Sequence, residues 1–583
     1  MTTTVSQRPL IIQSDKSILL EVDSPAFEAA RDALAGFADL EKSPEHIHTY
    51  RITPLSLWNA ASSGLGGDAV IEALKQYSKY PLPANVETDI REYLSRYGRL
   101  KLVRQGADLA LISDDVALIR EIARHREIQP HILGQADPHR LTVDPARRGH
   151  IKQALLVIGY PAEDLAGYVD GAALSFELRH TSRHGREFSL RGYQTQAADA
   201  FHAGGGPVGG SGVIVLPCGA GKTIVGIAAM HKLQMATLIL TTNTVAARQW
   251  MDELLDKTSL QEDQVGEYSG LRKQVRPVTV ATYQIMTYGR KLGKGHNGKG
   301  SQFPHLALFN EQNWGLIIYD EVHLLPAPVF RVTAEIQARR RLGLTATLVR
   351  EDGRQGDVFS LIGPKKYDAP WKDLEQQGWI AVAECHEVRI PLPDEMRLDY
   401  ALADGQERYR LAAENPRKLD VLAKLVEKHS QDSILIIGMY LSQLQHIARE
   451  YHWPLITGQT GVRERQRLYD AFRRGEIRCL VVSKVGNFAI DLPDANVAIQ
   501  VSGTFGSRQE EAQRLGRILR PKEQSLLAHF YGLVSRDSVD QSFAAKRQLF
   551  LTEQGYHYEI IYEDEIDDWH PRRHSVVDGS CEA

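Results

Sequence analysis

One loop, residues 216–223, constrains the fold of this chain more than any other stretch of its sequence. The loop reads Leu-Pro-Cys-Gly-Ala-Gly-Lys-Thr, follows the apolar run 213–215 and opens into an alanine- and isoleucine-rich segment. An apolar β-branched run, a glycine turn and a helical pattern together predict a strand–loop–helix unit. Its glycines allow backbone N–H groups to surround a phosphate, and the helix N-terminus adds a favourable dipole. We therefore expect a nucleotide-binding α/β domain around this loop.

Two side chains of the loop have roles in binding a nucleoside triphosphate. Lys222 would reach the β- and γ-phosphates, and the hydroxyl of Thr223 would ligate Mg²⁺. The full motif has glycine at its first position, where this chain has Leu216. A glycine turn before an ordinary helix is therefore the alternative interpretation of the loop taken alone.

An apolar strand pattern that ends in two carboxylates supplies a second part of such a site. Residues 315–323 read Gly-Leu-Ile-Ile-Tyr-Asp-Glu-Val-His. Beside a phosphate loop, Asp320 can hold Mg²⁺ through water, and Glu321 can orient or deprotonate the attacking water. In isolation the pair would be a solvated acidic turn, but downstream of a phosphate loop the catalytic interpretation is favoured.

A second α/β region, residues 373–560, contains a helix with two arginines on one face. A capping box at Ser507 opens this helix, and Pro521 ends it. By the helical period its aligned face carries Gln509, Gln513, Gly516, Arg517 and Arg520. Two guanidinium groups suit a clamp on a γ-phosphate that stabilises transition-state charge, whereas a basic solvated face is the alternative. The strand and helix patterns that precede it are strands at 433–439 and 479–483 and helices at 441–450 and 463–473.

The helical and strand patterns of residues 1–130 predict a separate N-terminal α+β module. Pro54 starts a helix, two more helical patterns follow at 68–77 and 86–97, and residues 100–112 read as a hairpin. Helices followed by a two-stranded wing indicate a winged-helix-like unit, which would dock on DNA or on a partner protein. A structural cap without a ligand is an equally good interpretation.

The remaining boundaries follow from polar junctions and charged stretches. Residues 131–185 would form a small connecting domain before the phosphate-loop domain, 186–372. A charged helical stretch, 394–415, precedes the first strand of the second α/β domain. The last segment, 561–583, begins as an acidic tail that we expect to be disordered.

Composition narrows the class of protein. A chain of 583 residues is too long for one core, and its net charge of -4 means that DNA binding would have to be local. Four cysteines lie far apart with no Cys-x-x-Cys pair, which disfavours a zinc site, an iron–sulfur cluster or a disulfide framework and suits a reducing cytosol. The chain has no leader pattern and no apolar run of membrane-spanning length, so a cytoplasmic protein without a membrane partner is expected.

In their order and spacing, these motifs resemble those of superfamily 2 helicases over about the last two-thirds of the chain. Three stretches narrow the resemblance. Asp-Glu-Val-His at 320–323, the tripeptide Arg350-Glu351-Asp352 and the segment 503–520 are together similar to the xeroderma pigmentosum group B (XPB) helicase family in its bacterial form. The family implies two tandem RecA-like parallel-sheet domains with ATP bound in the cleft between them.

The resemblance also implies roles for individual residues. Gln194 would read adenine, and Asp320 and Glu321 would serve Mg²⁺ and water activation, with Arg517 and Arg520 completing the site. The residues assigned to ATP binding are Gln194, Gly219, Ala220, Gly221, Lys222, Thr223, Asp491 and Gln513. Arg350, Glu351 and Asp352 match the strand-separation element of the family. The stretch 394–415 lies where the family carries its thumb, and residues 131–185 lie where it carries a damage-recognition domain.

The function implied is that of an ATP-dependent 3′→5′ DNA helicase or translocase acting in DNA repair, with ATP and Mg²⁺ as cofactors. Arg248 and Thr282, on loops that follow strands of the first domain, are candidates for contacts with the DNA backbone, which would be independent of base sequence and sensitive to salt. A repair nuclease or a transcription factor as a partner is left open.

Three other functions remain as alternatives. A double-stranded DNA translocase would remodel its substrate without separating the strands, and an ATP-regulated scaffold would recruit repair or transcription factors through residues 1–130. An RNA helicase is disfavoured because the Asp-Glu-Ala-Asp box typical of RNA helicases is absent from the sequence.

Overall fold

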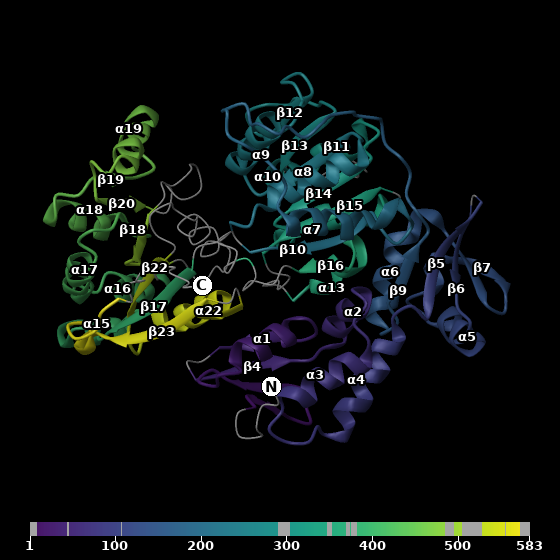
Figure 1. Ribbon diagram of the computed structural model, residues 1–583, viewed down its shortest axis with the longest axis horizontal. Helices are drawn as coiled ribbons and strands as arrows, with labels where there is room; N and C mark the ends of the chain where they lie inside the picture. The colour runs from purple at the N-terminus through teal and green to yellow at the C-terminus, as the bar shows by residue number, and fades with distance from the viewer. Residues whose placement is uncertain are drawn as a thin grey trace, which may run out of the picture. The chain divides into compact units, whose positions relative to one another are not determined.

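In the computed structural model, the described residues form four sheets, and the chain divides into two compact units near residue 370 (Figure 1). The described residues are 8–43, 46–106, 108–217, 219–289, 303–337, 339–346, 353–368, 374, 382–483, 495–503, 527–553 and 556–571. No helix within these ranges is both long enough and apolar enough to cross a membrane.

The N-terminal sheet has the strand order β1-β2-β4-β3 and is accompanied by four helices. The strands are β1 (Leu10–Ile12), β2 (Ser17–Glu21), β3 (Asp39–Lys42) and β4 (Ile47–Arg51), and the helices are α1 (Phe27–Ala35), α2 (Pro54–Ser62), α3 (Gly67–Tyr77) and α4 (Ala84–Arg96). Helix α2 begins at Pro54 because the Thr53 hydroxyl accepts a hydrogen bond of 3.0 Å from the Ser56 N–H, which caps the first turn. The three helices expected between residues 54 and 97 are confirmed.

The expected hairpin forms, but it belongs to a second sheet with the order β7-β8-β6-β5-β9. The elements are β5 (Leu100–Gln105), β6 (Asp108–Ile112), α5 (Val116–Arg124), β7 (Ile132–Asp137), β8 (Arg140–Val143), α6 (Arg148–Val157) and β9 (Ala162–Leu165). Strand β6 pairs with β8 in the register Leu111↔Leu141, and these strands share one buried core with α5 and α6.

This pairing corrects the boundary predicted at residue 130, which cuts through a single sheet. It also corrects the winged-helix-like interpretation, because the hairpin is the centre of a five-stranded sheet and not a wing of the preceding helices. A hairpin signal is local, since it depends on the turn and the two flanking strands. The strands that complete the sheet lie up to 65 residues away, from Leu100 to the end of β9 at Leu165.

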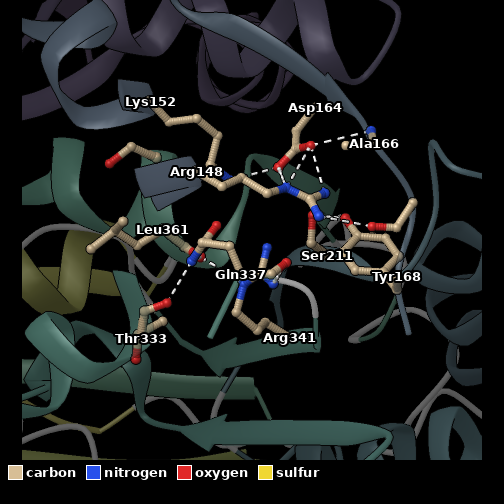
Figure 2. Close-up of polar contacts among 12 residues, drawn as sticks. Arg148, Lys152, Asp164, Ala166, Tyr168, Ser211, Thr333, Gln337, Arg341 and Leu361 are labelled. Carbon is tan, nitrogen blue, oxygen red and sulfur yellow. Dashed lines mark hydrogen bonds and ion pairs between the residues drawn. The ribbon is translucent and has the colours of Figure 1, made fainter. Parts of the chain in front are cut away.

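A buried polar network joins this second sheet to the sheet that follows it (Figure 2). Asp164 of β9 accepts from Arg148 Nη2 at 2.7 Å and from Lys152 Nζ at 2.8 Å, both on α6. The Tyr168 hydroxyl donates to Ser211 Oγ, on the first strand of the next sheet, at 2.7 Å. Because Arg148 and Lys152 are almost completely buried, their charges are stabilised by groups of the protein and not by water.

The third sheet is parallel throughout, with the order β12-β13-β11-β14-β15-β10-β16. Its strands are β10 (Ser211–Val215), β11 (Thr237–Thr241), β12 (Val265–Tyr268), β13 (Val278–Thr282), β14 (Leu316–Asp320), β15 (Arg340–Thr345) and β16 (Lys365–Asp368). Its helices are α7 (Gly192–His202), α8 (Lys222–Leu233), α9 (Thr244–Lys257), α10 (Tyr283–Met286), α11 (Leu308–Glu311), α12 (Ala327–Glu335) and α13 (Gln355–Asp357). The strand–loop–helix unit expected around the phosphate loop is confirmed as β10 followed by α8.

The second unit is built on another parallel sheet, with the order β19-β20-β18-β21-β22-β17-β23. Its strands are β17 (Val382–Ile390), β18 (Ile434–Gly438), β19 (Leu455–Ile456), β20 (Cys479–Ser483), β21 (Val497–Gln500), β22 (Leu527–Ser535) and β23 (His557–Tyr562). Its helices are α15 (Asp394–Leu402), α16 (Gly405–Ala413), α17 (Arg417–Lys428), α18 (Leu441–Glu450), α19 (Val462–Arg473) and α22 (Val539–Glu553). The predicted fold class, two parallel α/β sheets after an N-terminal α+β part, is confirmed.

The acidic segment after β23 is ordered where the structure describes it, which corrects the prediction of a disordered tail. Ile566 is completely buried in the core of the second unit. Glu563 pairs with Arg417 at 2.6 Å, and Asp567 pairs with Lys424 at 2.7 Å, both on α17. The acidic run therefore packs against a basic helix face, and the isoleucine between the carboxylates anchors it to the core.

Candidate active site

The phosphate loop has the backbone geometry that its glycines predict. Gly219 has a φ of 84° and Gly221 a φ of 79°, both in the left-handed region that L side chains rarely adopt. A Cβ atom at Gly221 would also lie 2.7 Å from Nε2 of Gln194. The backbone conformation therefore favours glycine at position 221, directly before the first residue of α8, Lys222, and a side chain there would also displace the Gln194 amide.

Leu216, which departs from the full motif, has a structural role. Its side chain is completely buried, and its N–H donates to the Thr345 carbonyl at 2.9 Å. This bond continues the β10–β15 ladder by one residue, so leucine anchors the start of the loop to the sheet. The phosphate-binding turn begins after it.

Lys222 and Glu321 meet at the carboxyl ends of the strands, where Lys222 Nζ lies 3.0 Å from Glu321 Oε1. Glu321 follows β14 with a left-handed φ of 50°, a conformation that costs a non-glycine residue about 1–3 kcal/mol and is found at functional sites. Burial raises the pKa of Glu321, but Lys222 and His323 outweigh it and hold that pKa below its ordinary value. The carboxylate is therefore ionised at neutral pH.

Asp320, the last residue of β14, is held by its neighbours. Trp250 Nε1 donates to Asp320 Oδ2 at 2.9 Å, and the Tyr283 hydroxyl donates to the Asp320 carbonyl at the same distance. Burial and the charge of Glu321 raise the pKa of Asp320 to about 6, although Trp250 and Lys222 oppose this shift. Among the described residues, two carboxylates beside a single lysine leave an excess of negative charge, which fits a divalent cation with oxygen ligands.

Trp250 contacts the candidate site, and the sequence alone did not identify it as a site residue. Its ring also packs on α8, since a Cβ atom at Gly226 would lie 2.5 Å from the Trp250 ring. An indole on α9, 70 residues before its carboxylate partner, has no local sequence signature. The signal in the sequence was the glycine at position 226 within a helix, which indicates close packing but does not name the partner.

His323 connects the carboxylates to the neighbouring strand. Its Nδ1 lies 2.8 Å from the Thr345 hydroxyl at the end of β15 and 3.6 Å from Glu321 Oε2. The Thr345 hydroxyl thus links the end of β15 to the residue two positions after Glu321.

Gln194, predicted to read adenine, is buried on α7 against the phosphate loop. Its Oε1 accepts from the Arg191 N–H at 3.0 Å, and its Nε2 donates to the Tyr193 hydroxyl at 3.4 Å. The side chain therefore fixes the first turn of α7 and touches Gly221 at the same time. Thr223, the second residue of α8, is partly buried one position after Lys222.

The two predicted DNA contacts differ in accessibility. The Arg248 side chain is 57% exposed, and its guanidinium lies 3.8 Å from the buried carboxylate of Glu267. Thr282 is only 2% exposed, and its hydroxyl caps α10 by accepting from the Ile285 N–H at 3.3 Å. Arg248 is thus available to a phosphate, whereas the Thr282 hydroxyl serves the helix cap.

The other predicted site residues lie outside the described part of the chain. They are Arg350, Glu351, Asp352, Asp491, Gln513, Arg517 and Arg520. The described residues that the structure brings together are Gln194, Gly221, Lys222, Asp320 and Glu321, along with His323 and Trp250.

Comparison with known proteins gives matches along nearly the whole chain. The family model described as ERCC3/RAD25/XPB C-terminal helicase matches residues 374–575. The model described as a helicase conserved C-terminal domain matches residues 10–137, and the one described as type III restriction enzyme, res subunit, matches residues 187–350.

Curated relatives match over nearly all of this chain. The chain is 56% identical to the DNA 3'-5' helicase XPB of Kineococcus radiotolerans, over 98% of this chain and 99% of the relative. It is also 56% identical to the protein of the same name from Mycobacterium tuberculosis, over 96% and 98% of the two chains. The general transcription and DNA repair factor IIH helicase/translocase subunit XPB/SSL2 of Saccharomyces cerevisiae is 33% identical over 95% of this chain and 72% of its own length.

Proposed function

We propose, since this chain belongs to the XPB helicase family, that it couples ATP hydrolysis to 3′→5′ movement along DNA and to strand separation in DNA repair. The observation that carries the proposal is the ion pair between Lys222 and Glu321 at the mouth of the phosphate loop. It joins the lysine that binds phosphate to the carboxylate that activates water, in one cluster with Asp320.

We infer the following order of events at this site. Lys222 leaves Glu321 when it binds the γ-phosphate, because a triphosphate offers it more negative charge. Glu321 is then released to orient and deprotonate the attacking water, and its lowered pKa keeps it ionised for that role. His323 contacts both Glu321 and Thr345, so a movement of the Glu321 carboxylate would be transmitted through it to the end of β15.

Mg²⁺ belongs to this proposal as the cofactor. Asp320 and Thr223 would hold it, and it would neutralise charge on the β- and γ-phosphates. The donor set fits, because Trp250 and the Glu321 N–H orient the Asp320 carboxylate at 2.9 and 3.1 Å. Gln194, Gly219, Ala220 and Gly221 are proposed to contact the nucleotide, together with Asp491 and Gln513. Arg517 and Arg520 are proposed to stabilise the transition state.

DNA is the proposed partner, bound through its backbone. Arg248 is the described candidate for a phosphate contact, and Arg350, Glu351 and Asp352 are proposed to separate the strands. Thr282 stays a weaker candidate because its hydroxyl is buried. A repair nuclease or a transcription factor as a further partner, and a cytoplasmic location, are also part of the proposal.

The deciding experiment measures ATP hydrolysis and strand displacement on forked DNA of both polarities, with an RNA fork as control. We expect DNA-stimulated hydrolysis and displacement of the fork that requires 3′→5′ movement. Hydrolysis without displacement on any fork would favour a double-stranded DNA translocase, an alternative supported by the word translocase in the name of the yeast relative. Equal stimulation by RNA would overturn the DNA assignment.

The scaffold alternative has its own test. We expect Glu321→Gln to abolish hydrolysis and, with it, DNA repair in cells. Repair that survives the loss of hydrolysis would instead assign the chain to a scaffold that acts through its N-terminal residues.

A further inference from the structure

A second cluster of ionisable side chains lies in the other parallel sheet, on adjacent strands. Glu384 and His386 are two residues apart on β17, so they share one face of the sheet. His529 on β22 stands in register with Glu384, and parallel register partners point to the same side. All three side chains are buried, with exposures of 7%, 2% and 7%.

The distances within this cluster are those of a metal site before small adjustments. Oε2 of Glu384 lies 3.6 Å from Nδ1 of His529 and 3.8 Å from Nε2 of His386, and the three atoms are all within 4.8 Å of one another. Ligands bound tetrahedrally to Zn²⁺ at about 2.0–2.1 Å lie roughly 3.3–3.4 Å apart. The two edges at Glu384 therefore need side-chain movements of a few tenths of an ångström to reach this spacing, and the third edge, between the two histidines, is no longer than 4.8 Å.

An outer partner orients the first histidine. His386 Nδ1 lies 3.1 Å from Glu559 Oε2 on β23, and because a carboxylate accepts, this ring nitrogen donates. In the neutral imidazole the lone pair is then on Nε2, the nitrogen that faces Glu384. Glu559 is held in turn by Trp569, whose Nε1 donates to it at 3.3 Å. A carboxylate behind a histidine is the usual second layer of protein metal sites.

The second histidine has its nitrogen directed into the same space. Nδ1 of His529 is buried and makes no hydrogen bond to any described residue, which is unusual for a polar atom in a core. The neighbouring His429 differs, because its Nδ1 contacts Asp432 at 2.8 Å and its Nε2 contacts the Tyr531 hydroxyl at 2.7 Å. His429 is therefore part of the wall and is not a ligand.

The position of the cluster separates it from the nucleotide chemistry. Glu384 and His529 are each the third residue of their strands, near the amino ends of β17 and β22. Open parallel sheets bind nucleotides outside the carboxyl ends of their strands. An ion at the opposite end would join β17 and β22 and, through Glu559, secure β23.

We propose that Glu384, His386 and His529 form a binding site for a divalent transition metal ion, with Zn²⁺ as the expected occupant. Two imidazoles and one carboxylate are ligands that Zn²⁺ accepts, and three protein ligands leave a fourth position for water. The site uses no cysteine, so the absence of Cys-x-x-Cys pairs does not bear on it. The assignment is independent of the proposed helicase function.

The test is metal binding by the full chain purified without a histidine tag. After treatment with a chelator, reloading with Zn²⁺ and removal of the excess, elemental analysis should find about one ion per chain. Co²⁺ should give the visible absorption bands of a tetrahedral site. Zn²⁺ should also raise the melting temperature of the chelated protein, since it binds the folded state.

Substitutions identify the ligands. Glu384→Gln, which keeps the shape of the side chain, and His529→Gln should each abolish retention of the ion and the Co²⁺ bands. Glu559→Gln, which removes only the outer partner, should weaken binding roughly 10- to 100-fold. His429→Gln is the matched control in the same core and should retain the ion.

Two results would overturn the assignment. One is wild-type protein that retains no Zn²⁺ and no Co²⁺ after loading, in which case the cluster is a histidine–carboxylate ion-pair network. The other is a folded Glu384→Gln variant, verified by circular dichroism, that binds as tightly as the wild type. If Glu384→Gln does not fold, an unchanged affinity in Glu559→Gln together with non-tetrahedral Co²⁺ bands in the wild type would reject it equally.

Discussion

Lys222 and Glu321, at the carboxyl edge of the third sheet, form an ion pair of 3.0 Å, and Lys152 and Asp164, between the second sheet and the third, form one of 2.8 Å. The surroundings of these pairs differ in charge. Glu321 has a second carboxylate beside it, Asp320, so the site carries more negative charge than its lysine balances. Asp164 instead forms ion pairs with both Lys152 and Arg148, so positive charge is in excess around it.

The two clusters also differ in the groups that surround the charges. Around Asp164, Arg148 Nη1 donates to the Gly167 carbonyl at 2.9 Å, and the neighbouring Arg341 donates to the carbonyls of Leu361 and Gln337, each at 2.7 Å (Figure 2). Glu321 has a left-handed φ of 50° and pairs with Lys222, the residue directly after Gly221. Bonds from buried guanidinium groups to a carboxylate and to backbone carbonyls hold two sheets together, whereas an excess of negative charge at a strained residue suits the binding of a ligand.

The largest effect should come from removing the lysine of the site. Lys222→Ala takes away the cation proposed to bind the phosphates, so the kcat/KM for ATP should fall roughly 10³-fold or more while DNA binding largely survives. Lys232→Ala, at the far end of α8 in an ion pair of 2.6 Å with Asp199, is the matched control and should remain active. ATP hydrolysis by both proteins checks this, and wild-type turnover in Lys222→Ala would remove the functional distinction between the clusters.

The second effect should be on stability alone. Asp164→Asn leaves the buried charges of Arg148 and Lys152 without a carboxylate, which should lower the free energy of unfolding by about 3–5 kcal/mol. Asp170→Asn, at a pair with Arg340 in which Asp170 is 71% exposed, should change it by less than about 1 kcal/mol. Urea unfolding measures both. Loss of ATP hydrolysis in Asp164→Asn that still folds would show that the network also serves the site.

A third effect should depend on pH. Burial lowers the pKa of Lys152 from 10.5 to about 8, although Asp164 opposes the shift. At pH values between about 8 and 10.5, Lys152 keeps its proton in the unfolded chain and has lost it in the folded chain. The free energy of unfolding of the wild type should therefore rise with pH, by at most about 3 kcal/mol. In Lys152→Met this rise should be absent. Unfolding curves of both proteins from pH 8 to 10.5 test it, and parallel pH profiles would contradict the shift.

The smallest effect should come from Trp250→Phe, which removes the hydrogen bond to Asp320 and keeps the ring against Gly226. The Mg²⁺ concentration for half-maximal ATP hydrolysis should rise roughly 10-fold, because the orientation of the ligand is less defined. Trp314→Phe, which removes a bond of 2.9 Å to the Leu308 carbonyl elsewhere in the same domain, is the control. The measurement is the rate of ATP hydrolysis at increasing Mg²⁺ concentration. Equal curves for both variants would show that Trp250 serves packing alone.

Local patterns predicted the parts of the fold that local interactions produce. Helix α18, strand β20 and the start of helix α2 at Pro54 are formed where the sequence indicated, because hydrophobic period, strand composition and helix-start signals act within a few residues. The phosphate loop and the Asp320–Glu321 pair were found for the same reason. The predictions were wrong where the contacts are distant in sequence. The hairpin 100–112 pairs with strands far along the chain, and Ile566 is buried although its acidic neighbours suggested a disordered segment.

The sequence by itself determined the class of fold, the family resemblance and the residue types that nucleotide chemistry needs, because each depends on order and spacing along the chain. Only the tertiary structure decided that Lys222 pairs with Glu321, that Trp250 holds Asp320, and that Glu384 and His529, 145 residues apart, stand in register. Such contacts depend on which strands become neighbours and which faces they share. That choice is made by packing of the whole domain, and no short segment of sequence contains it.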